Sequence, residues 1–461
     1  MGRVWNRISA AVALAAIAAG SLAGAPANAK WGPVQDLATF SLLNGLPPFA
    51  FASNARGDRL VVWDSGDGFA FAQAPPGRRF GAPVQLRPTD GYNEFLPDLE
   101  MDERGNALLL WSYFDQTAYY DRTACCEGLR ARVIRADGSV TDTQTLVPRG
   151  YSVSRDRTDM QIGRDGRMGV VFPLGQYQSE SWPRLAARFG TVDKGFGRLE
   201  HIGGPSYAQQ PSLSFAGGRA HVTYMKALER GKGAQETGRA RIVDLERRRA
   251  DSYRPGRTIV TPMRLDSLRV ATASSGDQVA LWARERPGFA TIVYVATRAA
   301  GGPFRPRRLA RESRFTGPYA APSIEPGGNA LAYWGSALSR SIVTSLRLPG
   351  HEFGALTHFG PSWDGIVTNP VVASVNAPAH ALIVWVDAPG SGQGTRRLVA
   401  AFRNARGAEL EEHEIARDDG NETYGFMSGR FGVTLDNRDR ASVVYVENAR
   451  LKAVTGRIGP G

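Results

Sequence analysis

The chain contains only two cysteines, and they stand next to each other as Cys125 and Cys126. Each has only the other as a disulfide partner within the chain, and export into an oxidising compartment favours that bridge. Adjacent Cα atoms lie ~3.8 Å apart, which is below the usual disulfide span, so we predict a strained vicinal disulfide. Two interpretations stay open: the bridge rigidifies a long loop, or it contacts a ligand there.

Motifs for metals, cofactors and covalent catalysis are absent as well. The six histidines show no His-Glu-x-x-His spacing, and there is no Gly-x-Ser-x-Gly elbow, phosphate-binding glycine loop or EF-hand pattern. We therefore expect no cofactor and no bound metal. Long apolar runs are missing beyond residue 29, so no membrane-spanning helix is predicted.

Lysine is scarce: it occurs at five positions, so nearly all of the formal net charge of +12 comes from arginine. The arginines are spread along the chain, and only Arg247 to Arg249 forms a run. This spread argues against nucleic-acid binding, because phosphate backbones are bound by clustered basic side chains. An acidic glycan or an acidic cell surface stays open as a partner.

The N-terminus has the pattern of a secretory signal peptide. Met1 to Arg7 carries two arginines, Ile8 to Ala19 is almost wholly apolar, and Ala27-Asn28-Ala29 supplies a small-x-small cleavage site. The apolar segment is shorter than the ~20 residues that a spanning helix needs. We predict a cleaved signal peptide at residues 1–29, one mature domain at residues 30–461, and a secreted or periplasmic location.

An apolar run that ends in an aromatic residue recurs eight times, at intervals of 48 to 61 residues. A repeat of this length is typical of solenoids, propellers and arrays. The runs are apolar at consecutive positions, as expected where both faces of a sheet are covered, so each aromatic residue is predicted to pack between neighbouring sheets. The runs end at Trp63, Trp111, Phe172, Tyr224, Trp282, Trp334, Trp385 and Tyr445.

The second repeat shows the predicted unit. Leu96 to Met101 is the first strand, Asp102 to Asn106 a tight turn, and Ala107 to Trp111 the second strand. Leu129 to Arg135 and Thr141 to Val147 are the third and fourth strands. Four short antiparallel strands in each repeat make a propeller blade, so the predicted fold class is all-β.

The N-terminal and C-terminal segments are predicted to form one blade together. Trp31 to Leu37 resembles the outer strand Phe80 to Leu86 but has no inner strands before it, whereas the last repeat stops after a third strand near Leu451 to Arg457. We therefore predict an eight-bladed β-propeller closed by the N-terminal strand, which removes both open edges. Seven blades is the alternative, if one of the weak repeats at Phe172 and Tyr224 is an insertion. The protein is expected to be a monomer.

A resemblance to a known group rests on three features: the signal peptide, the turn Asp102 to Asn106 before an apolar run, and the segment Phe80-Gly81-Ala82-Pro83. Together they resemble secreted bacterial β-propeller repeat proteins, which are loosely grouped with sialidase-like folds. The resemblance covers nearly the whole mature chain. It implies the propeller fold, but it does not assign a particular reaction. Sialidases carry Asp boxes, Ser-x-Asp-x-Gly-x-x-Trp, and this chain has none: Ser65-Gly66-Asp67-Gly68 has the wrong spacing and lacks the tryptophan.

Aromatic residues recur in the predicted loops from one blade to the next, on the face where propellers of this kind meet ligands. Such a ring around the central opening, with Asp, Asn and Arg nearby, is typical of sugar binding. The alternative is that each aromatic ring packs over the end of its own blade. The candidate ligand-binding residues are Tyr92, Tyr151, Tyr207, Tyr319, Trp363 and Tyr424, with Arg155, Arg157, Arg311 and Arg314.

Glycan hydrolysis requires paired carboxylates, or a tyrosine activated by one. Asp418, Glu422 and Tyr424 in the last inter-blade loop are the catalytic candidates. The first functional hypothesis is an exported, non-catalytic propeller that binds a glycan or another cell-surface ligand on its loop-rich face. The second is a glycan-active hydrolase or lyase with its site in the central opening, and the third is a protein-interaction scaffold.

Overall fold

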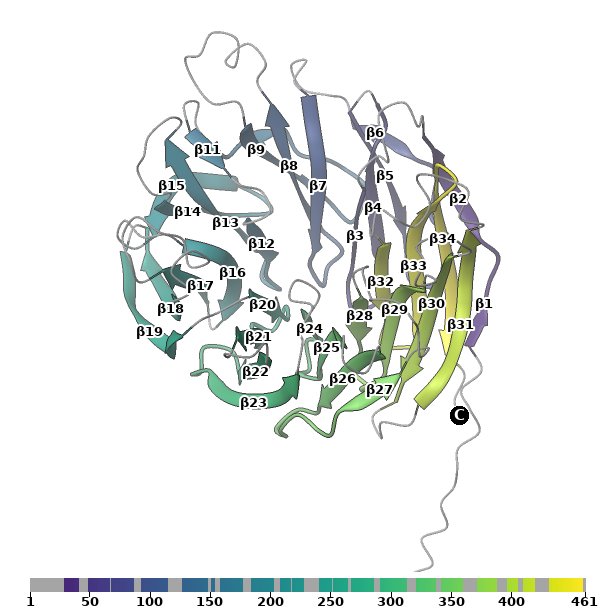
Figure 1. Ribbon diagram of the computed structural model, residues 1–461. Coiled ribbons are helices and arrows are strands. Elements are labelled where there is room, and N and C mark those ends of the chain that lie inside the picture. The colour runs from purple at the N-terminus through teal and green to yellow at the C-terminus, as the bar shows by residue number, and fades with distance from the viewer. Residues whose placement is uncertain are drawn as a thin grey trace, which may run out of the picture.

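The computed structural model contains eight antiparallel β-sheets arranged in a ring (Figure 1). The protein is therefore an eight-bladed β-propeller, as predicted, and the seven-bladed alternative is wrong. No helix occurs in the part of the chain that the structure describes. That part comprises residues 29–40, 49–66, 68–86, 93–114, 127–147, 151–153, 158–176, 184–202, 208–216, 218–227, 240–250, 252–263, 267–285, 291–312, 321–336, 341–359, 371–387, 396–404, 409–418 and 431–458.

Each blade begins with an inner strand, and the eight inner strands contact one another in a ring around the central opening. Numbered as blades 1 to 8, they are β3 (Phe49–Ser53), β7 (Asn93–Met101), β12 (Asp159–Ile162), β16 (Ala208–Ala216), β20 (Ser267–Thr272), β24 (Ala321–Ile324), β28 (Val372–Val375) and β32 (Phe431–Leu435). Blade 3 has a further short strand, β11 (Tyr151–Val153), which pairs with the same neighbour as β12.

Second, third and outermost strands follow in each blade. The second strands are β4 (Arg59–Asp64), β8 (Ala107–Phe114), β13 (Arg167–Gln176), β17 (Arg219–Ala227), β21 (Gln278–Glu285), β25 (Ala330–Ser336), β29 (Ala381–Asp387) and β33 (Arg440–Glu447). The third strands are β5 (Phe69–Ala74), β9 (Glu127–Ile134), β14 (Arg184–Thr191), β18 (Ala240–Arg249), β22 (Thr291–Arg298), β26 (Ser341–Arg347), β30 (Arg396–Arg403) and β34 (Arg450–Ile458). The outermost strands of blades 1 to 7 are β6 (Val84–Leu86), β10 (Gln144–Thr145), β15 (Gly195–Ile202), β19 (Ser252–Met263), β23 (Arg305–Glu312), β27 (Thr357–Phe359) and β31 (Glu409–Asp418).

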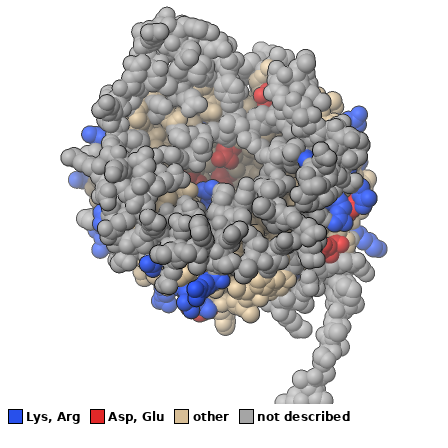
Figure 2. All heavy atoms as spheres, in the orientation of Figure 1, with Lys and Arg blue, Asp and Glu red and all other residues tan. Residues whose placement is uncertain are grey.

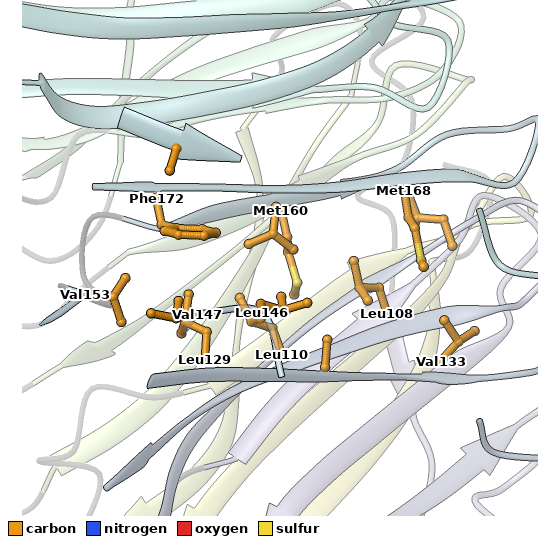
Figure 3. Packing of buried hydrophobic residues seen from close by; sticks show 14 of the residues in the cluster. Leu108, Leu110, Leu129, Val133, Leu146, Val147, Val153, Met160, Met168 and Phe172 are labelled. Atoms are coloured by element: carbon orange, nitrogen blue, oxygen red, sulfur yellow. The ribbon is translucent and has the colours of Figure 1, made fainter. Parts of the chain in front are cut away.

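The core lies between the blades. Second strands are buried on both faces, and Trp334 and Trp385 have no exposed surface, which confirms the predicted packing role of the aromatic residues. Between blades 2 and 3, Leu108 and Leu129 face Met160 and Phe172 across the interface (Figure 3). Consecutive apolar residues on a second strand therefore serve two different cores, one on each side of the blade.

Tight turns join the first strand of each blade to the second, and they lie on one face of the ring. In blade 2 the Asp102 carboxylate accepts hydrogen bonds from the backbone N–H groups of Arg104 at 2.9 Å and Asn106 at 2.8 Å. Gly105 has φ of 91°, a conformation that favours glycine. Asn54 of the preceding turn donates from Nδ2 to the Asp102 carbonyl oxygen at 3.1 Å, so neighbouring turns are linked.

The N-terminal segment closes the ring. Strands β1 (Ala29–Trp31) and β2 (Gln35–Thr39) both pair antiparallel with β34, so they occupy the outermost position of blade 8, as predicted. Trp31 stacks on Phe402 of blade 7 at a centroid distance of 6.1 Å. Gln35 donates from Nε2 to the Phe80 carbonyl oxygen of blade 1 at 2.9 Å and accepts from the Phe80 N–H at 3.1 Å. One segment thus contacts three consecutive blades.

In blade 2 the first, second and fourth strands differ in length from the prediction. The first two strands are longer, whereas the fourth, β10, is reduced to two residues. The predicted segment still follows β9, because the Thr141 N–H donates to the Val133 carbonyl oxygen at 3.0 Å and the Leu146 N–H donates to that of Leu129 at 2.8 Å. An outermost strand has a partner on one side only, which makes it the least regular strand of a blade.

Candidate functional site

Carboxyl groups gather on the inner strands of blades 2 and 3. Among the side chains that the structure describes on the eight inner strands, the acidic ones are Asp98 and Glu100 on β7 and Asp159 on β12, and the basic one is Arg269 on β20. We call the three acids the carboxyl cluster, since each of Asp98 and Asp159 acts electrostatically on Glu100. Figure 2 shows acidic atoms in the central hollow with basic atoms beside them.

The position of these side chains along their strands is the same in several blades. Asp98, Asp159 and Arg269 each stand four residues before the first residue of the turn that follows their strand. They therefore lie at one depth in the central opening. Most other blades carry a small or apolar residue at this position, namely Ala50, Ser212, Ala321, Val372 and Gly432.

The backbone around the carboxyl cluster is irregular in three consecutive blades. The register between β7 and β8 shifts between Phe95 and Asp98, and that between β16 and β17 shifts between Gln209 and Ser212, where Gln210 has φ of 48°. In blade 3 the inner position is divided between β11 and β12. The other five inner strands pair without a register shift over their described residues. Bulges and strained residues are enriched beside functional sites, so blades 2 to 4 mark one part of the opening.

Burial and mutual repulsion change the acidity of the cluster. Burial raises the pKa of Glu100 to about 8, and the charges of Asp159 and Asp98 raise it further. Burial also raises the pKa of Asp159 to about 7, although its Oδ2 accepts a hydrogen bond of 2.6 Å from the Leu213 N–H on β16. Interacting carboxyls titrate as a group, so the cluster retains a proton near neutral pH and presents both a donor and acceptors.

Three turns meet at one end of the central opening. Ser274 in the turn of blade 5 donates from Oγ to Glu103 Oε1 in the turn of blade 2 at 2.8 Å. Arg164 Nε in the turn of blade 3 donates to Ser274 Oγ at 3.2 Å. Blades 2 and 5 are not neighbours in the ring, so these contacts reach across it. The opening therefore narrows on the side of the turns, and the carboxyl cluster lies above this constriction.

The raised pKa values predict that stability falls as the pH rises. Folded Glu100 and Asp159 have pKa values above their ordinary 4.5 and 3.8, so between those values and about 8 the folded state keeps protons that the unfolded chain releases. The free energy of unfolding therefore decreases across this window. Over this window we expect the free energy of unfolding to fall by roughly 2 kcal/mol less in the Glu100→Gln variant than in the native protein. One pKa unit corresponds to about 1.4 kcal/mol, and the effect is reduced because Glu100 is only partly buried.

Urea unfolding at about pH 5 and about pH 9 measures this difference. The control is Asp142→Asn, which removes one exposed charge from the same blade. A Glu100→Gln profile parallel to that of the native protein would contradict the assignment.

Eleven of the residues singled out in the sequence lie outside the described residues: Tyr92, Cys125, Cys126, Arg155, Arg157, Tyr207, Arg314, Tyr319, Trp363, Glu422 and Tyr424. The other three lie on strands. Tyr151 begins β11 and packs, partly buried, against the core between blades 2 and 3. Arg311 on β23 and Asp418 at the end of β31 belong to outermost strands, so both lie at the rim and not at the central opening.

Inspection of the loops alone missed the carboxyl cluster, because its members belong to strands. One signal for it is present in the sequence. When the repeats are aligned on their tight turns, blades 2 and 3 carry Asp98 and Asp159 where five other blades carry small or apolar residues. Within the described ranges, no group of three or more His, Cys, Asp or Glu side chains has the arrangement of a metal site. No described helix has the length and hydropathy needed to cross a membrane.

A separate cavity of about 190 Å³ lies between blades 4 and 5 and is lined by His221, Asp244 and Glu246. The two acidic side chains that line this cavity are paired with neighbouring basic and hydroxyl groups. Asp244 accepts hydrogen bonds from Arg298 Nη1 at 2.7 Å and from Thr223 Oγ1 at 3.0 Å, and Glu246 pairs with Arg219. This network therefore acts as a polar connection between two blades.

Comparison with known proteins identifies a fold. No protein-family model matches the chain, and no curated protein matches its sequence. The lectin BP39L from Burkholderia pseudomallei is similar over 80% of this chain and 99% of its own, with a TM-score of 0.52 and 11% identity. The WD40 domain of SCAP from fission yeast matches over 93% and 98% (TM-score 0.48, 6% identity), and the Hadza microbial sialidase Hz136 over 94% and 95% (TM-score 0.39, 10% identity).

Proposed function

We propose that the protein is an exported β-propeller that binds a glycan in its central opening, through the carboxyl cluster and Arg269. The observation that carries the proposal is that all three inner-strand acids lie on blades 2 and 3, which are two of the three consecutive blades whose inner strands are irregular. A sequence selected only for packing would place small or apolar residues there, as most of the other blades do. Binding without catalysis is the simplest function that these residues support.

The chemistry of the cluster suits a polyhydroxylated ligand. An ionised carboxylate accepts hydrogen bonds from two hydroxyl groups, and a protonated one donates. Hydrogen bonds to charged groups are stronger than those between neutral groups, and they strengthen further where the surroundings are of low dielectric. Arg269, at the same depth, supplies donors for ring or carboxylate oxygens of a sugar.

The expected result is that Asp98→Asn combined with Asp159→Asn weakens glycan binding by at least about tenfold, or ~1.4 kcal/mol. A glycan array identifies the ligand, and isothermal titration calorimetry measures its affinity. The matched control is Asp142→Asn combined with Asp193→Asn, which removes one exposed charge from each of the same two blades outside the opening. Equal affinities for both double variants would refute a central site.

A glycan-active hydrolase or lyase is the second candidate, and one observation favours it. Glu100, with a pKa of about 8, is protonated at neutral pH beside Asp159, as a general acid beside a second carboxyl would be. If the protein is an enzyme, incubation with the glycan releases smaller sugars, and Glu100→Gln stops the release while binding persists. Intact glycan after prolonged incubation with native protein favours the binding function.

Export is part of the same proposal and rests on the N-terminal pattern. Cleavage after Ala29 would leave Lys30 as the first residue, within β1. The intact mass of protein recovered from the periplasm or medium would then correspond to residues 30–461. Recovery of the full-length mass from the cytoplasm alone would contradict export.

A further inference from the structure

A cavity of about 260 Å³ lies at the closure of the ring, between blades 8 and 1. We call it the closure cavity. Three separate parts of the chain line it: Lys30 and Gly32 of the N-terminal segment, Gly57, Arg59 and Gly77 of blade 1, and the three strands of blade 8. It is therefore formed only when the N-terminal strand is in place, and it lies apart from the carboxyl cluster.

The lining of the closure cavity is strongly basic. Four cationic side chains, those of Lys30, Arg59, Arg440 and Arg457, face one carboxylate, that of Asp436. Asp436 is already engaged, since its Oδ2 accepts from Arg440 Nε at 2.6 Å and its Oδ1 accepts from the backbone N–H of Arg440 at 3.0 Å. Asp58 and Asp439 act electrostatically on Arg59 and Arg457 from outside the lining, so the excess of positive charge is that of the lining itself.

Arg59 is the buried member of this set, with 4% of its surface exposed. Its Nη1 donates to Ser442 Oγ at 2.8 Å, and its guanidinium lies 5.3 Å from the centre of the Phe80 ring. Burial lowers the pKa of Arg59 to about 10 and the charge of Arg440 lowers it further, whereas the charges of Asp436 and Asp58 act in the opposite direction. A buried cation that is repelled by a second cation is stabilised by an added anion.

Hydroxyl groups complete the donor set of the cavity. Thr434, Ser442 and Thr455 line it together with the four cations. Guanidinium groups bind tetrahedral and planar oxyanions through paired N–H donors, and an ammonium group binds them as a point charge. The compensated cavity between blades 4 and 5 lacks such an excess of one charge, so the feature belongs to the closure and is not general to the blade interfaces.

We propose that the closure cavity binds a small oxyanion: free phosphate or sulfate, or the sulfate or carboxylate group of an acidic glycan. The bound anion contacts the N-terminal strand, blade 1 and blade 8 at once, so it stabilises the closed ring. A ligand that binds only the folded state raises the free energy of unfolding by RT ln(1 + [L]/Kd). Anion binding is thereby coupled to ring closure.

The test measures thermal unfolding of the native protein against increasing inorganic phosphate, with chloride keeping the ionic strength constant. The expected result is a rise in Tm that saturates. Lys30→Gln combined with Arg457→Gln should weaken the apparent affinity at least about tenfold. Both residues are exposed, so this variant is expected to fold, which circular dichroism checks. The control is Arg305→Gln combined with Arg308→Gln, two exposed cations on β23, for which phosphate binding should be unchanged.

Phosphate and sulfate also stabilise proteins by exclusion from their surface, and that effect does not saturate. An equal, unsaturated rise of Tm in the native protein and both variants would overturn the proposal. The two sources of the anion are separated by repeating the titration with sulfate, glucuronate and a sulfated monosaccharide. A sugar that binds at least about tenfold more tightly than the free ion identifies a glycan group, whereas equal affinities identify the free ion.

Discussion

A chain that lacks residues 1–39 is expected to lose at least about 5 kcal/mol of stability and to fail as a stable monomer. The deletion removes β1 and β2, which leaves the outer edge of β34 unpaired. Burial of Leu37 contributes about 1.5 to 3 kcal/mol, the partly buried Trp31 adds to this, and every lost backbone hydrogen bond adds ~0.5 to 1.5 kcal/mol. Proteins of this kind are stable by only about 5 to 15 kcal/mol, so the loss is a large part of the total.

Urea unfolding and size-exclusion chromatography measure the effect. The control is a chain that lacks residues 1–29, which keeps Lys30, Trp31 and all of β2 and should unfold like the full-length protein. A synthetic peptide of residues 30–40, added in excess, should restore stability to the shorter chain because it supplies the missing edge strand. An unfolding midpoint that is unchanged by the longer deletion would show that the ring does not depend on its closure.

Replacement of Trp282 by alanine is expected to destabilise the protein by about 3 to 5 kcal/mol, the usual range for emptying a large buried site. Trp282 is 2% exposed and stacks on Tyr294 with ring centroids 5.6 Å apart and planes 6° from parallel. Its neighbours Ile242 and Leu268 belong to blades 4 and 5, so a cavity there would loosen two blades at once. The free energy of unfolding in urea measures the loss.

Trp282→Phe is the matched control. Phenylalanine keeps most of the packing, and it removes the indole Nε1–H, which is buried without a hydrogen-bond partner among the described residues. The smaller ring leaves part of the site empty, but no polar group remains unsatisfied, so we expect a loss below about 1.5 kcal/mol. Similar losses for the alanine and phenylalanine variants would mean that the ring does not act by packing.

A central site and a closure site of opposite charge have different consequences. The carboxyl cluster stands on strands that the ring holds in place, so a ligand there meets a preformed site. The closure cavity includes Lys30, which belongs to a segment far in sequence from Arg440 and Arg457. The anion proposed to bind there would therefore report on whether the ring is closed.

The sequence by itself determined the number of blades, the burial of the aromatic residue in each second strand, and the closure by Trp31 to Leu37. These features follow from apolar runs and tight turns, which are local patterns repeated at a nearly constant interval. Strand ends were less predictable, as the two-residue strand β10 shows. An edge strand has few contacts to mark its limits.

Only the tertiary structure decided which polar residues meet. Asp98 and Asp159 are 61 positions apart in the sequence and Arg59 and Arg457 are 398 apart, yet the first pair interacts in the opening and the second pair lines one cavity. Conversely, Asp418 and Arg311, which the sequence placed in candidate loops, lie on outermost strands. The physical reason is that closure of the ring sets how far each strand lies from the central axis. The neighbouring residues in the sequence do not indicate that distance.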